Sequence, residues 1–163
     1  MSREIWDIYN IHGERQQRTI LRGEPLQAGD YHLVVQIWIK NEKGEFLIQQ
    51  RSENVKTSPG IWATTAGSVV AGEDSLTAAI RELREELGIE VAANELHLIT
   101  QTIKEDSLWS VWLLTRDIPL HKFTLQEVEV SQIRWTRPEK IKQMVAEGLF
   151  YDYGNNYFSQ IFA

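Results

Sequence analysis

The stretch from Gly67 to Ile89 constrains this chain more than any other part of the sequence. Asp74 or Ser75 can cap the start of a helix there, because a short oxygen-bearing side chain satisfies free N–H groups of the first turn. Gly88 can end the same helix. One narrow stripe at helical spacing is formed by Leu76, Ile80, Leu83 and Leu87. The stretch therefore predicts an amphipathic helix whose leucine stripe faces the core.

Three glutamates crowd one face of this predicted helix, opposite the leucine stripe. Glu82, Glu85 and Glu86 stand at i, i+3 and i+4, where like charges destabilise a helix by about 0.2 to 0.5 kcal/mol per pair. Glu85 and Glu86 also lie in the last turn, where the helix dipole disfavours exposed anions by about 0.3 to 1 kcal/mol each. Hard divalent cations are the natural counter-charge for clustered carboxylates. We therefore expect a Mg2+ site here, with Mn2+ able to replace Mg2+.

Neighbouring residues on the predicted helix fit this interpretation. Ala78 and Ala79 are small, and we expect them to leave room for metal ions and a diphosphate beside the glutamates. Arg81 carries a planar guanidinium that can hold a carboxylate in place. The alternative interpretation is a solvated helix face, on which the glutamates form surface ion pairs with Arg81 and Arg84.

The whole pattern favours the metal site, because it resembles the Nudix box at every defining position. Gly67 is followed after five residues by Glu73, and after seven more by the run from Arg81 to Ile89, which reads RELREELGI. The resemblance extends over roughly residues 31–137. It implies an α/β fold, namely an α/β/α sandwich with a mixed β-sheet. It also implies a metal-dependent hydrolase that cleaves a diphosphate bond in a nucleoside diphosphate linked to another moiety or in a similar small substrate.

Metal-binding roles follow from the resemblance residue by residue. Glu85 and Glu86 correspond to metal ligands, and Glu82 corresponds to a ligand or a general base. A backbone carbonyl around Ala66 or Gly67 would complete the shell of oxygen atoms around the metal.

Bracing roles follow for residues around these ligands. Arg81 resembles the residue that orients the carboxylates. Glu73 resembles the residue that braces the preceding loop and touches metal-bound water. We expect Gly67 and Gly72 to supply backbone freedom that other residues give only at a cost.

The general base and the substrate contacts are less constrained by the motif. Nudix enzymes draw the base either from the box or from a later loop, and Glu127 and Glu129 are the later-loop candidates here. The alternative for both is surface charge on an alternating strand. Arg51, at the end of a predicted hairpin, could contact substrate phosphate. Trp62 or Trp109 could stack on a base, although packing in the core is the favoured interpretation for a tryptophan.

Two other functions match parts of the sequence. Residues 22–35 resemble the Nudix subgroup related to isopentenyl diphosphate isomerase, which moves protons and cleaves no diphosphate. That enzyme needs a cysteine shortly before the box, whereas residues 62–67 read WATTAG. A nucleotide-sensing Nudix domain without turnover usually lacks box glutamates, and this chain retains them. Hydrolysis is therefore favoured over both alternatives.

The remaining sequence predicts one domain with an N-terminal extension. The 163 residues fit a single domain. Residues 1–30 are polar with turn signals, and their aromatic residues predict packing on the domain or on a partner subunit, which leaves a homodimer open. Residues 31–163 would form the Nudix domain, including a C-terminal helix at residues 138–147. Strands are predicted at residues 32–40, 46–51, 61–67, 95–103, 108–115 and 131–135.

Composition limits the partners of the chain. A formal net charge of −6 disfavours duplex nucleic acid, although a bound metal ion can still attract a small phosphorylated substrate. The absence of cysteine excludes disulfides, thiolate metal sites and thiol nucleophiles. The sequence shows no signal peptide and no apolar run of membrane-spanning length, so we expect a cytoplasmic location and no membrane contact.

Overall fold

The strands form two sheets in the computed structural model, which describes residues 3–163. The smaller sheet is a hairpin of β1 (Ile5–Tyr9) and β2 (Arg15–Leu21). The larger sheet has the order β5-β4-β3-β8-β7, with β6 paired to β3 and β9 paired to β4. Its strands are β3 (His32–Lys40), β4 (Phe46–Arg51), β5 (Trp62–Ala63), β6 (Thr65–Ser68), β7 (Leu96–Lys104), β8 (Ser107–Thr115) and β9 (Val130–Thr136).

The larger sheet is mixed, as the sequence predicts. β3 pairs in parallel with β8 along its whole length and antiparallel with β6. Its central residues, Val35 to Ile39, are β-branched, aromatic or amide-bearing and are all buried, which is typical of a strand covered on both faces. The predicted α/β class with a mixed sheet is confirmed.

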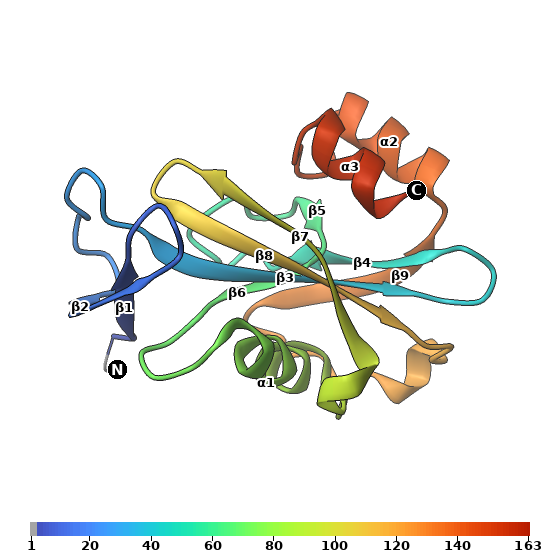
Figure 1. Ribbon diagram of the computed structural model, residues 1–163. Helices are drawn as coiled ribbons and strands as arrows, with labels where there is room; N and C mark the ends of the chain where they lie inside the picture. Colours follow the sequence, from blue (N-terminus) through green and yellow to red (C-terminus); the bar gives the residue numbers. More distant parts are fainter. Residues whose placement is uncertain (1–2) are drawn as a thin grey trace.

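Helices cover both faces of the larger sheet (Figure 1). α1 (Ser75–Leu87) lies on one face, where it contacts β6 and β3. α2 (Pro138–Ala146) and α3 (Asn155–Ile161) lie together on the other face. Two short 3-10 helices lie at Ala93–Glu95 and Leu120–Lys122. No helix in the described part of the chain is both long and apolar enough to cross a membrane.

Each face of the sheet carries its own core cluster, because successive side chains of a strand point to opposite faces. The first core cluster, on the α1 side, is mostly aliphatic and includes Val35, Ile37, Ile39, Leu83 and Leu87. The second core cluster, on the α2 and α3 side, is rich in aromatic residues and includes Trp38, Phe46, Phe150, Tyr157 and Phe158.

α3 is an element that the sequence does not predict. It has seven residues and follows Gly154, whose φ of 96° is open mainly to glycine. Tyr157 and Phe158 pack from α3 into the second core cluster, and the Tyr157 hydroxyl accepts a hydrogen bond of 2.8 Å from Trp38 Nε1. Tertiary packing on the sheet, more than a local helical pattern, therefore accounts for this short helix.

The N-terminal segment folds back onto the domain. Tyr9 forms an isolated antiparallel bridge with Tyr31, and the Trp6 ring stacks on His32 with ring centroids 4.1 Å apart. Asp7, on β1, is buried. The β1–β2 hairpin thus sits beside the loop that leads into α1 (Figure 1).

α1 presents a wider face to the sheet than the leucine stripe alone predicts. Leu83 and Leu87 are buried as expected, but Ala78 and Ala79 are also 0% exposed and belong to the first core cluster. The prediction that these alanines leave room for metal ions is therefore wrong. Their small side chains instead let the helix pack against β3 and β6, which brings the flanking Glu82 to the buried side as well.

Candidate active site

α1 has the two ends that the sequence predicts, and they fix where the glutamates lie. Asp74 caps the N-terminus, since its Oδ1 accepts a hydrogen bond of 2.8 Å from the Thr77 N–H. Gly88 ends the helix in the left-handed conformation with a φ of 68°. Between these caps, Glu82 and Glu86 turn toward the sheet and Glu85 remains exposed.

The carboxyl group of Glu82 lies directly against the backbone of β6 at Gly67. A Cβ added to Gly67 would lie 2.1 Å from Glu82 Cδ, which is far inside van der Waals contact. Gly67 is not among the residues with positive φ, whereas Gly72 has a φ of 89°. The prediction of backbone freedom holds for Gly72 but is wrong for Gly67, because Gly67 supplies space for a carboxylate.

Glu82 and Glu86 are carboxyl groups held largely out of water. Burial raises the pKa of Glu82 to about 7, against the opposing effect of Arg81. Burial raises the pKa of Glu86 to about 8, and the nearby charge of Glu82 adds to the rise. Only 7% of Glu82 and 8% of Glu86 is exposed. Both groups therefore need a further positive charge before they can ionise together at neutral pH.

Two polar residues on strands of the sheet hold Glu86 in place. Gln49 Nε2, on β4, donates a hydrogen bond of 3.0 Å to Glu86 Oε2. Thr65 Oγ1, on β6, donates a hydrogen bond of 2.8 Å to Gln49 Oε1 and so fixes the orientation of the amide. The sequence analysis identified neither residue. Nothing in the local sequence distinguishes Gln49 from the adjacent Gln50.

Arg81 joins the remaining carboxylates of the site. Its guanidinium donates to both carboxylate oxygens of Glu73, at 2.7 and 2.9 Å, and to Glu82 at 2.9 Å and Glu85 at 3.2 Å. It also donates to the Ser68 carbonyl at 3.1 Å. Burial disfavours the charge on Glu73, but hydrogen bonds from Arg81 and the Val70 N–H outweigh burial and lower the pKa of this carboxyl.

The predicted ligands lie around Arg81 and β6. Ala66 and Gly67 are β6 residues paired with Gln36 and Val35 of β3, and Gly67 touches Glu82. Within residues 3–163 no three acidic or histidine side chains converge in the arrangement of a bound metal. One carboxylate oxygen of Glu82 and one of Glu85 accept hydrogen bonds from Arg81 instead. Carboxylate and carbonyl oxygens are nonetheless the donors that Mg2+ prefers, so the residues fit this ion.

The later-loop glutamates lie in a turn directly before β9. Both are exposed, as the surface-charge alternative predicts, but its strand is wrong at these positions, because β9 begins only at Val130. The loop is tied to the end of α1, because the Gln126 N–H donates to the Glu86 carbonyl at 3.1 Å. The charge of Glu129 acts on Glu86 and contributes to its raised pKa. The described residues show no comparable link for Glu127.

The two predicted substrate contacts have different surroundings. The Arg51 guanidinium donates to Thr57, at 2.9 Å to its carbonyl and 3.1 Å to its hydroxyl, and its charge acts to lower the pKa of Glu86. Trp62 is buried in the second core cluster, and the Arg134 guanidinium covers its ring at 4.4 Å. Trp109 lies in the same cluster. We therefore keep Arg51 as a candidate contact and assign Trp62 to the core.

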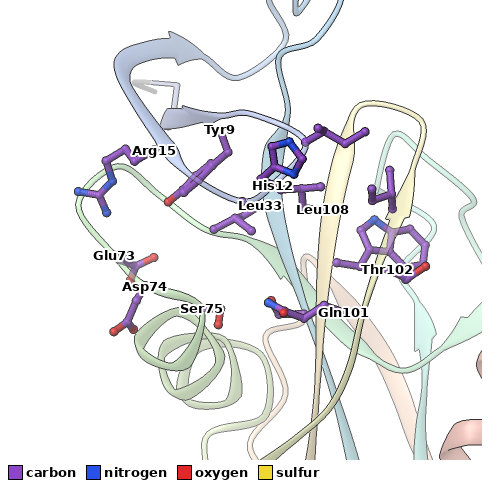
Figure 2. A pocket seen from close by; sticks show the side chains of 15 residues that line it. Tyr9, His12, Arg15, Leu33, Glu73, Asp74, Ser75, Gln101, Thr102 and Leu108 are labelled. Carbon is purple, nitrogen blue, oxygen red and sulfur yellow. The ribbon is translucent and has the colours of Figure 1, made fainter.

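A cavity of about 500 Å3 lies between the N-terminal hairpin, the start of α1 and the β7–β8 strands (Figure 2). Its wall includes Tyr9, Arg15, Ser75 and Gln101, together with Glu73. Glu82, Glu85 and Glu86 are not part of its lining. Glu73 is thus the residue through which the cavity adjoins the Arg81 network.

The chain that carries this site is similar to a family model and to several known proteins. A family model described as NUDIX domain matches residues 30–152. An uncharacterized Nudix hydrolase of Listeria innocua is 37% identical over 151 residues, which cover 92% of this chain and 89% of that protein. The crystal structure of DR0079 from Deinococcus radiodurans matches with a TM-score of 0.80 at 24% identity and covers 97% of both chains. The Nudix domain of NrtR from Shewanella oneidensis, solved with ADP-ribose, matches with a TM-score of 0.64 at 16% identity and covers 86% of this chain and 92% of that one.

Proposed function

The chain belongs to the Nudix hydrolase family, and from this premise we propose that it is a Mg2+-dependent pyrophosphohydrolase of a nucleoside diphosphate linked to another moiety. The observation that carries the proposal is the pair of buried carboxyls, Glu82 and Glu86, with the exposed Glu85 beside them. Buried carboxyl groups without a full counter-charge are costly to a fold. Their presence is explained if they serve to hold a divalent cation.

Glu82, Glu85 and Glu86, with a backbone carbonyl of Ala66 or Gly67, would hold Mg2+ in this proposal. The cation would supply positive charge against the diphosphate and would lower the pKa of water at the site. Mn2+ has the same preference for oxygen ligands and would substitute.

The side chains around the ligands would orient them and the substrate. Arg81, braced by both oxygen atoms of Glu73, holds Glu82 and Glu85 at fixed positions. The charge of Arg51 acts on Glu86, and Arg51 would pair with a substrate phosphate oxygen. Glu129 would accept the proton of the attacking water at its carboxylate, because its charge acts on Glu86 and its side chain is open to solvent. Glu82 is the alternative base.

The family and the net charge support the proposed substrate class. The Nudix domain of NrtR was solved with ADP-ribose, a nucleoside diphosphate linked to a sugar, and we take ADP-ribose as the first compound to test. The net charge of −6 disfavours a nucleic acid duplex. The relatives are described as Nudix hydrolases, and the isomerase alternative finds no support among them.

A substrate panel tests the proposal. The protein would be incubated with Mg2+ and ADP-ribose, a nucleoside triphosphate, a nucleotide sugar, a dinucleotide or isopentenyl diphosphate, and the products would be identified by mass. We expect phosphate-containing cleavage products from at least one nucleotide. Conversion of isopentenyl diphosphate to dimethylallyl diphosphate without cleavage would contradict the proposal.

A matched pair of variants shows whether the carboxylates carry the activity. Glu85→Gln removes one proposed ligand on the exposed side of α1, and hydrolysis should fall steeply. Glu90→Gln removes a nearby exposed carboxylate that pairs with Arg84 at 2.8 Å, and hydrolysis should stay near the parent rate. Equal activity of both variants would contradict the assignment of Glu85.

A further inference from the structure

The loop between β6 and α1 is held from outside by the N-terminal strand. The Gly72 N–H donates a hydrogen bond of 2.8 Å to Asp7 Oδ2, and the Ala71 N–H donates one of 2.8 Å to the Ile5 carbonyl. Asp7 and Ile5 both belong to β1. Two successive amides of the loop are therefore fixed by a strand that lies far earlier in the chain.

The Asp7 contact joins an exposed glycine of the loop to a mostly buried side chain of β1. Gly72 has a φ of 89°, and its N–H points away from the loop to a carboxylate of which 11% of the side chain is exposed. Arg15 Nε lies 3.5 Å from Asp7 Oδ2 and forms an ion pair with it.

The loop connects this contact to the carboxylates of α1 through Glu73 and Arg81. Gly72 directly precedes Glu73, whose Oε1 also accepts the Val70 N–H at 3.1 Å. Glu73 holds Arg81 at 2.7 and 2.9 Å, and Arg81 holds Glu82 and Glu85.

We propose that Asp7 is a positioning residue of the hydrolase: it fixes the Gly72 amide and thereby the Glu73–Arg81 pair that orients Glu82 and Glu85. The inference rests on the proposed function of the carboxylates. Asp7 itself lies outside residues 30–152, the part matched by the family model. The N-terminal hairpin is then a part of the active-site framework of this chain in addition to being a wall of the cavity in Figure 2.

Asp30 provides a matched control for Asp7. Asp30 accepts hydrogen bonds of 2.9 and 2.8 Å from Arg18 of β2, and 11% of its side chain is exposed, the same as for Asp7. Both aspartates anchor the N-terminal hairpin, but only Asp7 contacts the loop before α1. Asp7→Ala and Asp30→Ala thus separate loop positioning from attachment of the hairpin.

Kinetics with the best substrate of the panel give the first measurement. Loss of a residue that orients catalytic or metal-binding groups typically costs about 10 to 100-fold in activity. Asp7→Ala should lower kcat by that factor with a small change in KM, and Asp30→Ala should leave kcat near the parent value. Asp7→Asn keeps an oxygen acceptor for the Gly72 N–H and should restore most of kcat. Equal kcat in Asp7→Ala and Asp30→Ala would overturn the proposal.

Amide hydrogen exchange of Gly72, followed by NMR in the absence of substrate, gives a second measurement that needs no activity. The Gly72 amide should exchange slowly in the parent, Asp30→Ala and Asp7→Asn, and rapidly in Asp7→Ala. Asp7→Leu, which fills similar space without an acceptor, replaces Asp7→Ala if that variant does not fold. Unchanged exchange in the variant would overturn the role of Asp7, whereas a parent that cleaves no diphosphate would overturn the proposed function alone.

Discussion

The two faces of the larger sheet are filled in opposite ways. On the α2 and α3 side, the second core cluster packs aromatic rings against one another, with Trp38 and Phe46 meeting edge to face at 5.7 Å between ring centroids. On the α1 side, an aliphatic cluster is bordered by two buried carboxyls, Glu82 and Glu86. Aromatic packing on one face of the sheet therefore stabilises the fold, whereas the two buried carboxyls on the other face destabilise it locally.

Polar groups show the same difference in how they are satisfied. On the aromatic side, Trp38 Nε1 donates to the Tyr157 hydroxyl, which in turn donates to Gln36, so the buried polar atoms pair with one another. On the α1 side, Glu86 has Gln49 as a partner, yet its pKa is still raised to about 8. The unfavourable energy is concentrated where chemistry is proposed, as expected if function selected these residues.

The largest effect that would sharpen this comparison concerns the general base. Glu129→Gln should lower turnover by about 10² to 10⁴-fold, because proton transfer from water would lose its acceptor. Glu127→Gln changes the same type of side chain two residues away and should leave turnover nearly unchanged. Steady-state rates at saturating Mg2+ measure both. If Glu129→Gln keeps parental turnover, the base lies in α1, at Glu82.

A substitution on the opposite face tests whether that face serves stability alone. Phe158→Ala removes a buried ring from the second core cluster and should lower the free energy of unfolding by about 3 to 5 kcal/mol. Denaturant titration measures this loss, and kcat of the folded protein at low temperature should be unchanged. A large fall in kcat without loss of stability would break the division between the two faces.

The sequence predicted the elements whose causes are local. Asp74 and Gly88 mark the ends of α1 because capping depends on adjacent residues, and strands β3 and β4 end where turn residues begin. α3 was not predicted, because its residues are ordered by contact with Trp38, which lies 119 residues away from Tyr157 in the chain. Elements that depend on adjacent residues could thus be predicted from the sequence, and elements that depend on packing between distant residues could not.

The site shows the same limit. The box glutamates and Arg81 could be placed on one helix from spacing alone. The rotation of α1 about its axis could not be predicted, since it depends on how closely Ala78 and Ala79 approach β3 and β6. Gln49 lies 37 residues before Glu86, and only the pairing of β4 within the sheet brings the two side chains together.

Magnesium should stabilise the α1 face specifically. A ligand that binds only the folded state adds about 2.7 kcal/mol at a hundredfold excess over Kd, so Mg2+ should raise Tm of the parent. Glu85→Gln removes a proposed ligand on the exposed side and should gain less from Mg2+, whereas Glu90→Gln should gain as much as the parent. Thermal unfolding with Mg2+ or with a chelator measures the difference. Equal gains in all three proteins would remove Glu85 from the metal site.

The smallest effect concerns the closest approach on the α1 face, where a carboxylate packs on the backbone of β6. Gly67→Ala would place a methyl group 2.1 Å from Glu82 Cδ, and overpacking of this kind costs about 1 to 3 kcal/mol. Because the clash is with the Glu82 carboxyl, Gly67→Ala should cost clearly less in a Glu82→Ala background, with the free energy of unfolding measured without metal in each case. Gly72→Ala is the matched control: its φ of 89° makes alanine strained, but no heavy atom lies within 4 Å of the added Cβ, so its cost should be the same in both backgrounds. Gly67→Ala could instead lower the free energy of unfolding equally with and without the Glu82 carboxyl. In that case the backbone of β6 requires the glycine, and the contact with Glu82 does not explain why glycine occupies this position.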